Sequence, residues 1–320
     1  MRRKTMNLIK RLAALLLTGT MIFALAACSP KLISVPPSEM IANAAKKIAV
    51  AKDMTGSLKA ETEMAVGENK SAAKAETDIK VVYEPLNMHI FNKSNTDGDN
   101  ETTMETFVDE ANGTVSTYVK YGDQWMKQSL NREDALMALR MYDVRKNMET
   151  FLTAGTDWKE ISRENKVVKL EGTLTAETLK TIVEETKSLQ MVGMAGLTPE
   201  YYEGISDLKI TVLLDEMTGY PISYNVDFGS LLQVVTNNVM KNLKQQTQDS
   251  TAQIKVVKYN VTVACSQIGK TPKTEVSKEA LKSAVDFEEQ MAAQEVPKKD
   301  AAQEIPKKDA TQESGETKAE

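Results

Sequence analysis

The chain has few of the residues on which most catalytic and metal sites depend. Its 320 residues include one histidine, His89, and two cysteines, Cys28 and Cys265. Paired metal-ligand motifs, a phosphate-binding glycine loop and a nucleophile elbow are all missing from the sequence. A lone histidine in an alternating segment is typical of an ordinary strand residue. These absences argue against an enzyme, and we expect no catalytic residue, no metal site and no cofactor.

Acidic residues are numerous but form no recognisable site. The run 97–101 (Asp-Gly-Asp-Asn-Glu) is similar to part of a calcium loop. It lacks the spacing and the final bidentate glutamate of an EF-hand, so we interpret it as a solvated acidic turn. Glu184 and Glu185 lie beside Lys187, which is typical of the exposed face of a helix. A carboxylate pair for glycoside hydrolysis stays open, because nothing in the sequence selects one.

The charge balance argues against nucleic acid as a partner. The sequence has 40 Lys and Arg against 45 Asp and Glu, a net charge of −5. Residues 1–27 contain five of the basic residues and no acidic one, so their removal leaves 35 against 45, a net charge of −10. Neutralising a phosphate backbone requires clustered lysine and arginine. We therefore expect no nucleic-acid binding.

A long apolar run occurs only near the amino terminus. A basic start precedes Leu12–Ala26, which is apolar apart from residues 18–20. The run is too short to span a bilayer stably and has the right length for the apolar part of a signal peptide, residues 1–27. It closes on Leu25-Ala26-Ala27-Cys28, which resembles the lipobox of bacterial lipoproteins. An ordinary secretory signal with a chance cysteine at its border is the alternative.

The lipobox resemblance implies a membrane anchor. In bacterial lipoproteins the chain is cleaved before the cysteine, whose thiol carries a diacylglyceryl group. The new amine is acylated in many species, with chains such as palmitate. The protein is therefore expected to be held by Cys28 at the extracytoplasmic face of the cell membrane. Residues 28–37 contain three prolines and are predicted to form an extended tether.

Cys265 then has no intrachain disulfide partner. It continues an alternating run with Val261 and Val263. A free cysteine in such a pattern packs as a small apolar residue. We predict core filler rather than a reactive thiol.

The middle of the chain alternates apolar and polar residues, as strands with one buried face do. Asn112-Gly113 and the turn at Gly122-Asp123 predict tight hairpins. Strands that follow one another through short turns predict an antiparallel meander. The alternating residues are Leu58, Ala60, Thr62, Met64 and Val66; Ile79, Val81 and Tyr83; Met88 and Ile90; Leu208, Ile210, Val212 and Leu214; Ile222, Tyr224, Val226 and Phe228.

Apolar residues at helical spacing predict helices before and between these strands. The predicted helices begin with Ser38 as N-cap, run from Asn131 past Phe151 to an end at Gly155, start near Thr175, cover Leu231–Leu243, and close the domain at Lys278–Ala292. Such an order of elements is unlike the alternating strands and helices of importer substrate-binding proteins.

The carboxyl-terminal segment is repetitive. Residues 292–300 recur almost unchanged as 301–309, and a degenerate third copy begins at Ala310. Short polar repeats with proline and balanced charge cannot bury a core, so residues 294–320 are predicted to be disordered. A wall-spanning or partner-binding tail and a neutral expansion both stay open.

The order of elements resembles the LolA/LppX-like lipoprotein-carrier fold, most closely the uncharacterised lipoproteins of Gram-positive bacteria with this architecture. The likeness lies in 54–58 (Met-Thr-Gly-Ser-Leu), 121–127 (Tyr-Gly-Asp-Gln-Trp-Met-Lys) and the hairpin turn Asp215–Pro221. It covers Ser38 to Val276, within one domain predicted at 38–293. It implies an α+β class: a curved antiparallel sheet, or half-barrel, with helices over its concave face.

In that family the space between sheet and helices can hold acyl chains. The implied lining is the alternating apolar set, and methionine suits a surface that must fit variable chains. The residues expected to line such a cavity are Leu58, Met64, Ile79, Val81, Met88, Ile90, Leu208, Ile210, Tyr224 and Val226. The same pattern occurs in every half-buried sheet, so a filled core is the alternative.

Two functions follow from these expectations. The first is a membrane-anchored, non-enzymatic lipoprotein that binds a hydrophobic ligand, such as a lipid, in a half-barrel cavity. The second is a structural or interaction lipoprotein with a filled core that acts on partners in the cell envelope. The sequence identifies neither the ligand nor the partner.

Overall fold

The computed structural model describes residues 35–98, 101–246 and 253–289. The predicted signal peptide 1–27, Cys28 with most of the tether 28–37, and the tail 294–320 lie outside the described residues. These assignments stay predictions. Within the described ranges, no helix combines the length and the apolar character needed to cross a bilayer.

Twelve strands form the sheet in the described part of the chain. They are β1 (Asp53–Val66), β2 (Asn69–Tyr83), β3 (Leu86–Thr96), β4 (Thr102–Ala111), β5 (Thr114–Tyr121), β6 (Gln124–Asn131), β7 (Thr156–Glu164), β8 (Val167–Leu174), β9 (Leu208–Asp215), β10 (Pro221–Asp227), β11 (Ile254–Ser266) and β12 (Val285–Asp286).

The helices interrupt the strand order rather than alternate with it. They are α2 (Pro37–Ala49), α3 (Arg132–Ala138), α4 (Val144–Ala154), α5 (Ala176–Thr186), α6 (Gly229–Gln246) and α7 (Lys278–Ser283), with short 3₁₀ helices η1 (Arg140–Tyr142), η2 (Gln190–Val192) and η3 (Pro199–Tyr202).

The strand order is β12-β6-β5-β4-β3-β2-β1-β11-β10-β9-β8-β7. Apart from the short parallel pair of β12 with β6, the registers from β2 to β6 and from β7 to β11 are antiparallel. The predicted α+β class with an antiparallel sheet is confirmed. A meander of this kind arises because each strand turns back through a short loop onto its neighbour.

The chain divides into two compact units. Unit 1 comprises the described residues of Met1–Ala51, Ala60–Lys70 and Val144–Cys265. Unit 2 comprises those of Lys52–Lys59, Ser71–Asp143 and Ser266–Glu320.

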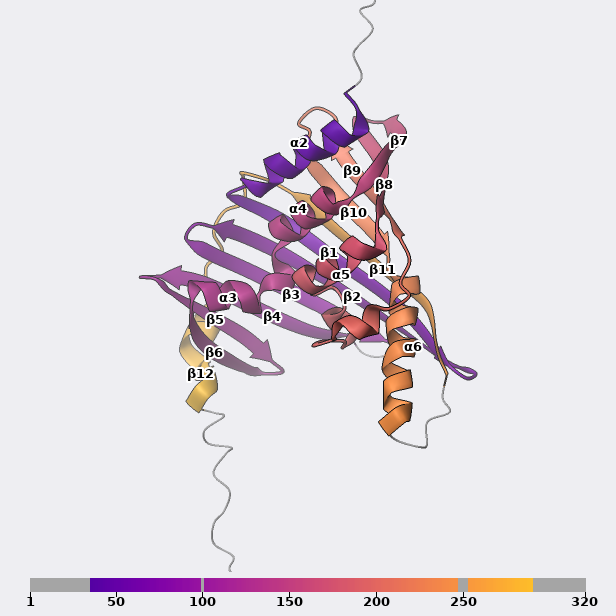
Figure 1. Ribbon diagram of the computed structural model, residues 1–320. Coiled ribbons are helices and arrows are strands. Elements are labelled where there is room, and N and C mark those ends of the chain that lie inside the picture. Colours follow the sequence, from indigo (N-terminus) through magenta and orange to yellow (C-terminus); the bar gives the residue numbers. More distant parts are fainter. Residues whose placement is uncertain (1–34, 99–100, 247–252, 290–320) are drawn as a thin grey trace, which may run out of the picture. The chain divides into compact units, whose positions relative to one another are not determined.

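In unit 1, helices cover one face of the sheet. Helix α2 packs on α4, and both contact β10 (Figure 1). The buried stripe of α2 contains Ile41, Ala44, Ala45 and Ile48, as its helical spacing predicts. Apolar stripes of this width drive a helix onto a sheet, because burial removes them from water.

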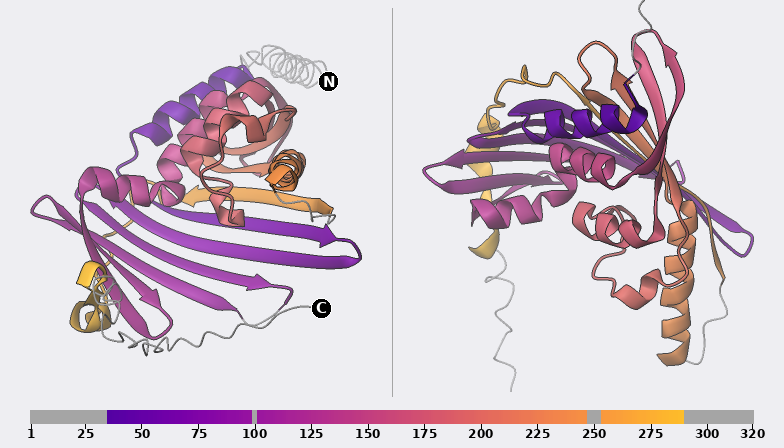
Figure 2. Two further views of the ribbon diagram at one scale, coloured as in Figure 1. Left: turned by 60° about the horizontal axis from the view of Figure 1, so that its bottom comes forward. Right: turned by 45° about the horizontal axis from the view of Figure 1, so that its top comes forward.

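In unit 2, strands β2 to β6 form an antiparallel meander (Figure 2). The β4–β5 turn has positive φ at Asn112 (53°) and Gly113 (79°), as a two-residue hairpin requires. The predicted hairpins at Asn112-Gly113 and Gly122-Asp123 are confirmed by the antiparallel pairing of β4 with β5 and of β5 with β6.

One face of the meander carries a cluster of Phe107, Tyr118 and Trp125, on which Ala280 of α7 packs.

The single helix predicted from Asn131 to Gly155 is wrong, although both of its ends are right. Asn131 caps α3 through its side chain, which accepts from the Asp134 amide at 2.9 Å. The helix then breaks, and α4 begins at Val144. At the break, Asp143 has a ψ of 82°, and its carboxylate accepts a 3.1 Å hydrogen bond from the Tyr83 hydroxyl. The helix is thus interrupted at a residue that binds Tyr83, 60 residues away in the sequence.

Two other helix ends differ from the prediction. Helix α2 starts at Pro37, so Ser38 lies inside its first turn and is not the N-cap; proline suits this position because the first helical amides lack partners. The predicted helix Lys278–Ala292 is interrupted: α7 ends at Ser283, and residues 287–289, the last that the structure describes, are helical again. The interruption lies where Val285 pairs with Met126 as a short parallel strand.

Candidate hydrophobic-ligand site

Four of the five predicted lining residues of unit 2 share one face of the meander. Ile79 lies opposite Ile90, and Val81 lies opposite Met88. All four are at most 3% exposed, and Leu58 is 6% exposed. Directly opposed residues point to the same side of a sheet, so the period of two placed these side chains correctly relative to one another.

The same face continues as a partly exposed apolar stripe, which we define as Met88, Ile90, Met104, Val108, Val119 and Met126. Met88 lies opposite Val108. Further along, the line from Ile90 crosses Thr106 to Val119 and Met126 in successive strands. Met104 lies opposite Asn92 on the same face. Met88, Ile90 and Val108 are buried, whereas Met104, Val119 and Met126 are half-buried.

The sequence prediction missed these three half-buried residues. Their strands do alternate, but threonine occupies several of the inward positions, including Thr106 and Thr117. Threonine favours strands yet weakens a purely hydrophobic signal. The pattern Met104-x-Thr106-x-Val108 contained the information, and only the register showed that it joins the predicted set.

His89 lies on the opposite face of the meander. Its Nε2 is 2.8 Å from Glu105 Oε1, and its ring stacks on Phe107 with centroids 4.6 Å apart. The histidine is thus engaged within the sheet, as expected of an ordinary strand residue. In the described ranges, no group of three or more His, Cys, Asp or Glu side chains gathers as a metal site would require.

The acidic run at 97–101 is only partly described. Asp97 accepts from the Ala72 amide at 2.6 Å and from the Ser71 hydroxyl at 3.0 Å. Its carboxylate therefore binds the start of β2 where β3 ends. Residues 99 and 100 lie outside the described part of the chain.

The predicted lining residues of unit 1 lie beneath its helices. Ile210 lies opposite Val226, and Leu208 lies on the same strand. The Phe151 ring of α4 packs on Tyr224 with centroids 4.4 Å apart. Side chains of unit 1 itself therefore fill this part of the face. For these residues, and for the half-buried Met64, a ligand contact stays a prediction.

Unit 1 also has an apolar groove of about 490 Å³ between α2 and α4. Its lining includes Ile41, Ala45, Leu152 and Trp158. The Trp158 ring lies against Gly155 and Gly172: a methyl group added to either glycine would come within 2.2 Å and 2.7 Å of it, respectively. This volume is in the range of small-ligand pockets.

Burial raises the pKa of two ionisable side chains in unit 1, Cys265 and Tyr259. Cys265 donates from Sγ to the Pro221 carbonyl, and burial raises the pKa of its thiol to about 12. Burial likewise raises the pKa of Tyr259, whose hydroxyl donates to the Ser188 carbonyl. A thiol with so high a pKa has almost no thiolate at neutral pH. The prediction that Cys265 is core filler is confirmed.

No family model matches the sequence, and neither does any curated protein. Solved structures with similar folds include LprF from Mycobacterium bovis (11% identity, TM-score 0.42, 75% of this chain and 96% of that chain). A β-barrel-like protein of domain of unknown function DUF1849 from Brucella abortus has 6% identity and a TM-score of 0.23, over 68% of this chain and 97% of that chain. A DUF1329 family protein from Desulfovibrio piger has 9% identity and a TM-score of 0.22, over 76% and 94%.

LprF has the LolA/LppX-like fold that this sequence resembles. At these TM-scores and identities, the likeness carries nothing about a ligand or an activity.

Proposed function

We propose that the protein is a non-enzymatic lipoprotein of the cell envelope that binds a hydrophobic ligand, such as a lipid, against the apolar stripe of unit 2. Diacylglyceryl-modified Cys28 anchors it to the extracytoplasmic face of the membrane. Support for the anchor comes from the basic start, the apolar run and Leu25-Ala26-Ala27-Cys28 in the sequence.

The observation that carries ligand binding is the gradient of burial along the apolar stripe. Met88, Ile90 and Val108 are almost fully buried, and on the same face Met104 and Met126 remain half-buried. Apolar side chains in this position gain free energy when a further apolar group covers them. Methionine is flexible and polarizable, so such a surface adapts to chains of different shape.

In unit 1 the apolar face is filled by the chain's own side chains, which favours the alternative of a structural or interaction lipoprotein with a filled core. Phe151 is fully buried and contacts both Tyr224 and Phe228. A structural or interaction lipoprotein would have every apolar face filled in this way. The two functions therefore differ in what they predict for Met104 and Met126.

The test is lipid co-purification by the full chain carrying Cys28→Ser, which removes the covalent lipid. Organic extraction and mass spectrometry measure the bound acyl lipid per protein. Replacing both Met104 and Met126 with glutamine keeps side-chain length but adds polarity. Since burying one methionine is worth about 1.5–3 kcal/mol, we expect at least about tenfold less bound lipid in the double variant.

Two matched controls locate the site. Met137→Gln makes the same change on α3, where the side chain is 70% exposed, and is expected to leave lipid unchanged. Ala42→Phe obstructs the α2–α4 groove and is expected to have no effect either. Absence of lipid above the level of an unrelated lipoprotein supports the filled-core alternative. Loss of lipid in the Ala42 variant alone moves the site to the groove.

A further inference from the structure

The β9–β10 turn of unit 1 presents an exposed apolar tip. Met217 in this turn is 74% exposed. Its neighbours are held from two other elements: Arg163 on β7 donates to Glu216 Oε1 at 2.8 Å, and Lys47 on α2 donates to the Thr218 carbonyl. Contacts on both sides of Met217 fix the turn, so little conformational entropy is lost when its tip meets a surface.

The turn is closed by its own polar side chains. Asp215 Oδ1 accepts from the Thr218 amide at 2.6 Å and from the Thr218 hydroxyl at 2.8 Å. Gly219 supplies the positive φ of 67° that the tight return needs. These bonds to Asp215 hold the turn in place, and Met217 is exposed at its tip.

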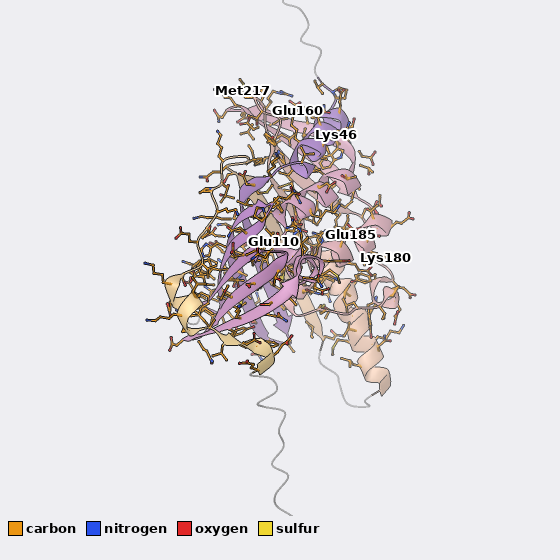
Figure 3. All side chains as sticks on the ribbon, turned by 90° about the vertical axis from the view of Figure 1, so that its left-hand side faces the viewer. Lys46, Glu110, Glu160, Lys180, Glu185 and Met217 are labelled. Atoms are coloured by element: carbon orange, nitrogen blue, oxygen red, sulfur yellow. The ribbon has the colours of Figure 1, made fainter. Side chains whose placement is uncertain are left out.

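The start of the described chain lies at the same end of unit 1. Val35, 43% exposed, lines a pocket of about 590 Å³ together with Glu160, Asp215 and Gly219. Met217 and Glu160 lie together at this end (Figure 3). Cys28 precedes Val35 by seven residues. Because a chain extends by no more than about 3.6 Å per residue, seven residues keep Cys28 within roughly 25 Å of Val35, which lines the pocket.

We infer that the β9–β10 turn, with Met217 at its tip, docks on the phospholipid bilayer that holds the lipid of Cys28. This inference rests on the proposed anchoring at Cys28. It adds an orientation: unit 1 meets the membrane through this turn rather than hanging freely from its tether.

The anchor is what makes so small a contact effective. One methionine transferred fully from water gains about 1.5–3 kcal/mol, which is too little to recruit a free protein. When the anchor already holds the chain at the bilayer, the same contact becomes intramolecular and faces a high effective concentration of lipid.

Charge plays little part in this contact. Among the residues that line the pocket, Lys47 and Arg163 face Glu160, Asp215 and Glu216, which leaves a net charge of −1. A nearly balanced surface gains nothing from anionic headgroups. Neutral phosphatidylcholine is therefore expected to suffice, with little dependence on salt.

The experiment uses the full lipidated chain carrying Met217→Cys, labelled with an environment-sensitive fluorophore and reconstituted into phosphatidylcholine vesicles. Cys265 is buried, and the parent chain without the substitution measures any labelling there. We expect a blue shift of emission on reconstitution. We also expect loss of emission when the lipids carry a quencher close to the headgroup.

Val257→Cys is the matched control in the same unit. Val257 is 45% exposed on β11. Ser223, just after the turn, pairs with Ala264, so Val257 lies seven residues further along β11, or about 23 Å away. A label at position 257 is expected to keep the emission it has in water.

The outcomes separate the inference from the proposed anchor. Protein that floats with the vesicles while the label at 217 behaves like the label at 257 overturns the docking and leaves the anchor intact. Protein that does not float overturns both. A shift at 217 that requires anionic lipid or vanishes in high salt overturns the apolar contact.

Discussion

Phe151 on α4 packs on Tyr224 of β10 with ring centroids 4.4 Å apart and ring planes tilted by 31°. Phe151 is fully buried, and its other aromatic neighbour is Phe228, 6.2 Å away between centroids. The three rings join helix and sheet in unit 1. This contact shows that unit 1 fills this part of its apolar face with its own side chains.

Phe151→Ala is expected to destabilise the protein by about 3–5 kcal/mol, because it removes a buried ring and leaves a cavity. The free energy of unfolding from urea titration measures the change. Val50→Ala, at a side chain 75% exposed in the same unit, is expected to change stability by no more than about 0.5 kcal/mol. A Phe151 variant as stable as the Val50 variant would show that the ring does not hold α4 on the sheet.

Gly172→Ala is expected to destabilise unit 1 by about 1–3 kcal/mol through overpacking. The added methyl would lie 2.7 Å from Trp158 Cε3, and the indole is held by its Nε1 donating to the Gly155 carbonyl at 2.8 Å. The cost should largely disappear when Trp158→Ala is already present, since the clash is then gone. Equal costs in both backgrounds would contradict the ring contact as its cause.

Asp215 makes stability depend on pH. The amide and hydroxyl of Thr218 donate to its carboxylate and lower the pKa of Asp215 in the folded state. The stabilisation by the Asp215 carboxylate is therefore present above the unfolded pKa of about 4 and is lost as pH falls through the lowered folded pKa. The difference in urea midpoint between wild type and Asp215→Asn should accordingly shrink on acidification below about pH 4. A difference that is constant with pH contradicts this role.

Cys28→Ser is expected to abolish incorporation of labelled palmitate and to release the protein or leave its signal uncut. The reason is that the proposed anchor attaches the diacylglyceryl group to this thiol. Cys265→Ser serves as the matched control, since the Cys265 thiol is buried and donates to Pro221. Labelling that persists without Cys28 contradicts the lipobox assignment.

Much of the fold could be predicted because strand faces and tight turns are encoded locally. Ile79, Val81, Met88 and Ile90 alternate in sequence and share one face in the structure. Asn112-Gly113 forms the expected turn because these two residues tolerate positive φ.

The predicted helix boundaries are wrong where residues far away in the sequence contact the predicted helix. Between α3 and α4, Tyr83 binds the carboxylate of Asp143 where helical spacing predicted continuity. Beyond α7, Val285 pairs with Met126 and interrupts the predicted helix. Neither contact changes the spacing of apolar residues in the segment that it interrupts. That spacing therefore cannot predict where a residue from another part of the chain ends a helix.

The sequence by itself determined the shared face of Ile79, Val81, Met88 and Ile90 and the hairpin turn at Asn112-Gly113, because each depends on residues close together in the chain. The lipobox at Cys28 is likewise read from neighbouring residues and stays a prediction. Only the tertiary structure decided that Phe151 covers Tyr224 in unit 1, while Met104 and Met126 of the apolar stripe in unit 2 stay half-buried. The physical reason is that alternation shows a face to be apolar without showing what covers it. That cover comes from side chains far away in sequence.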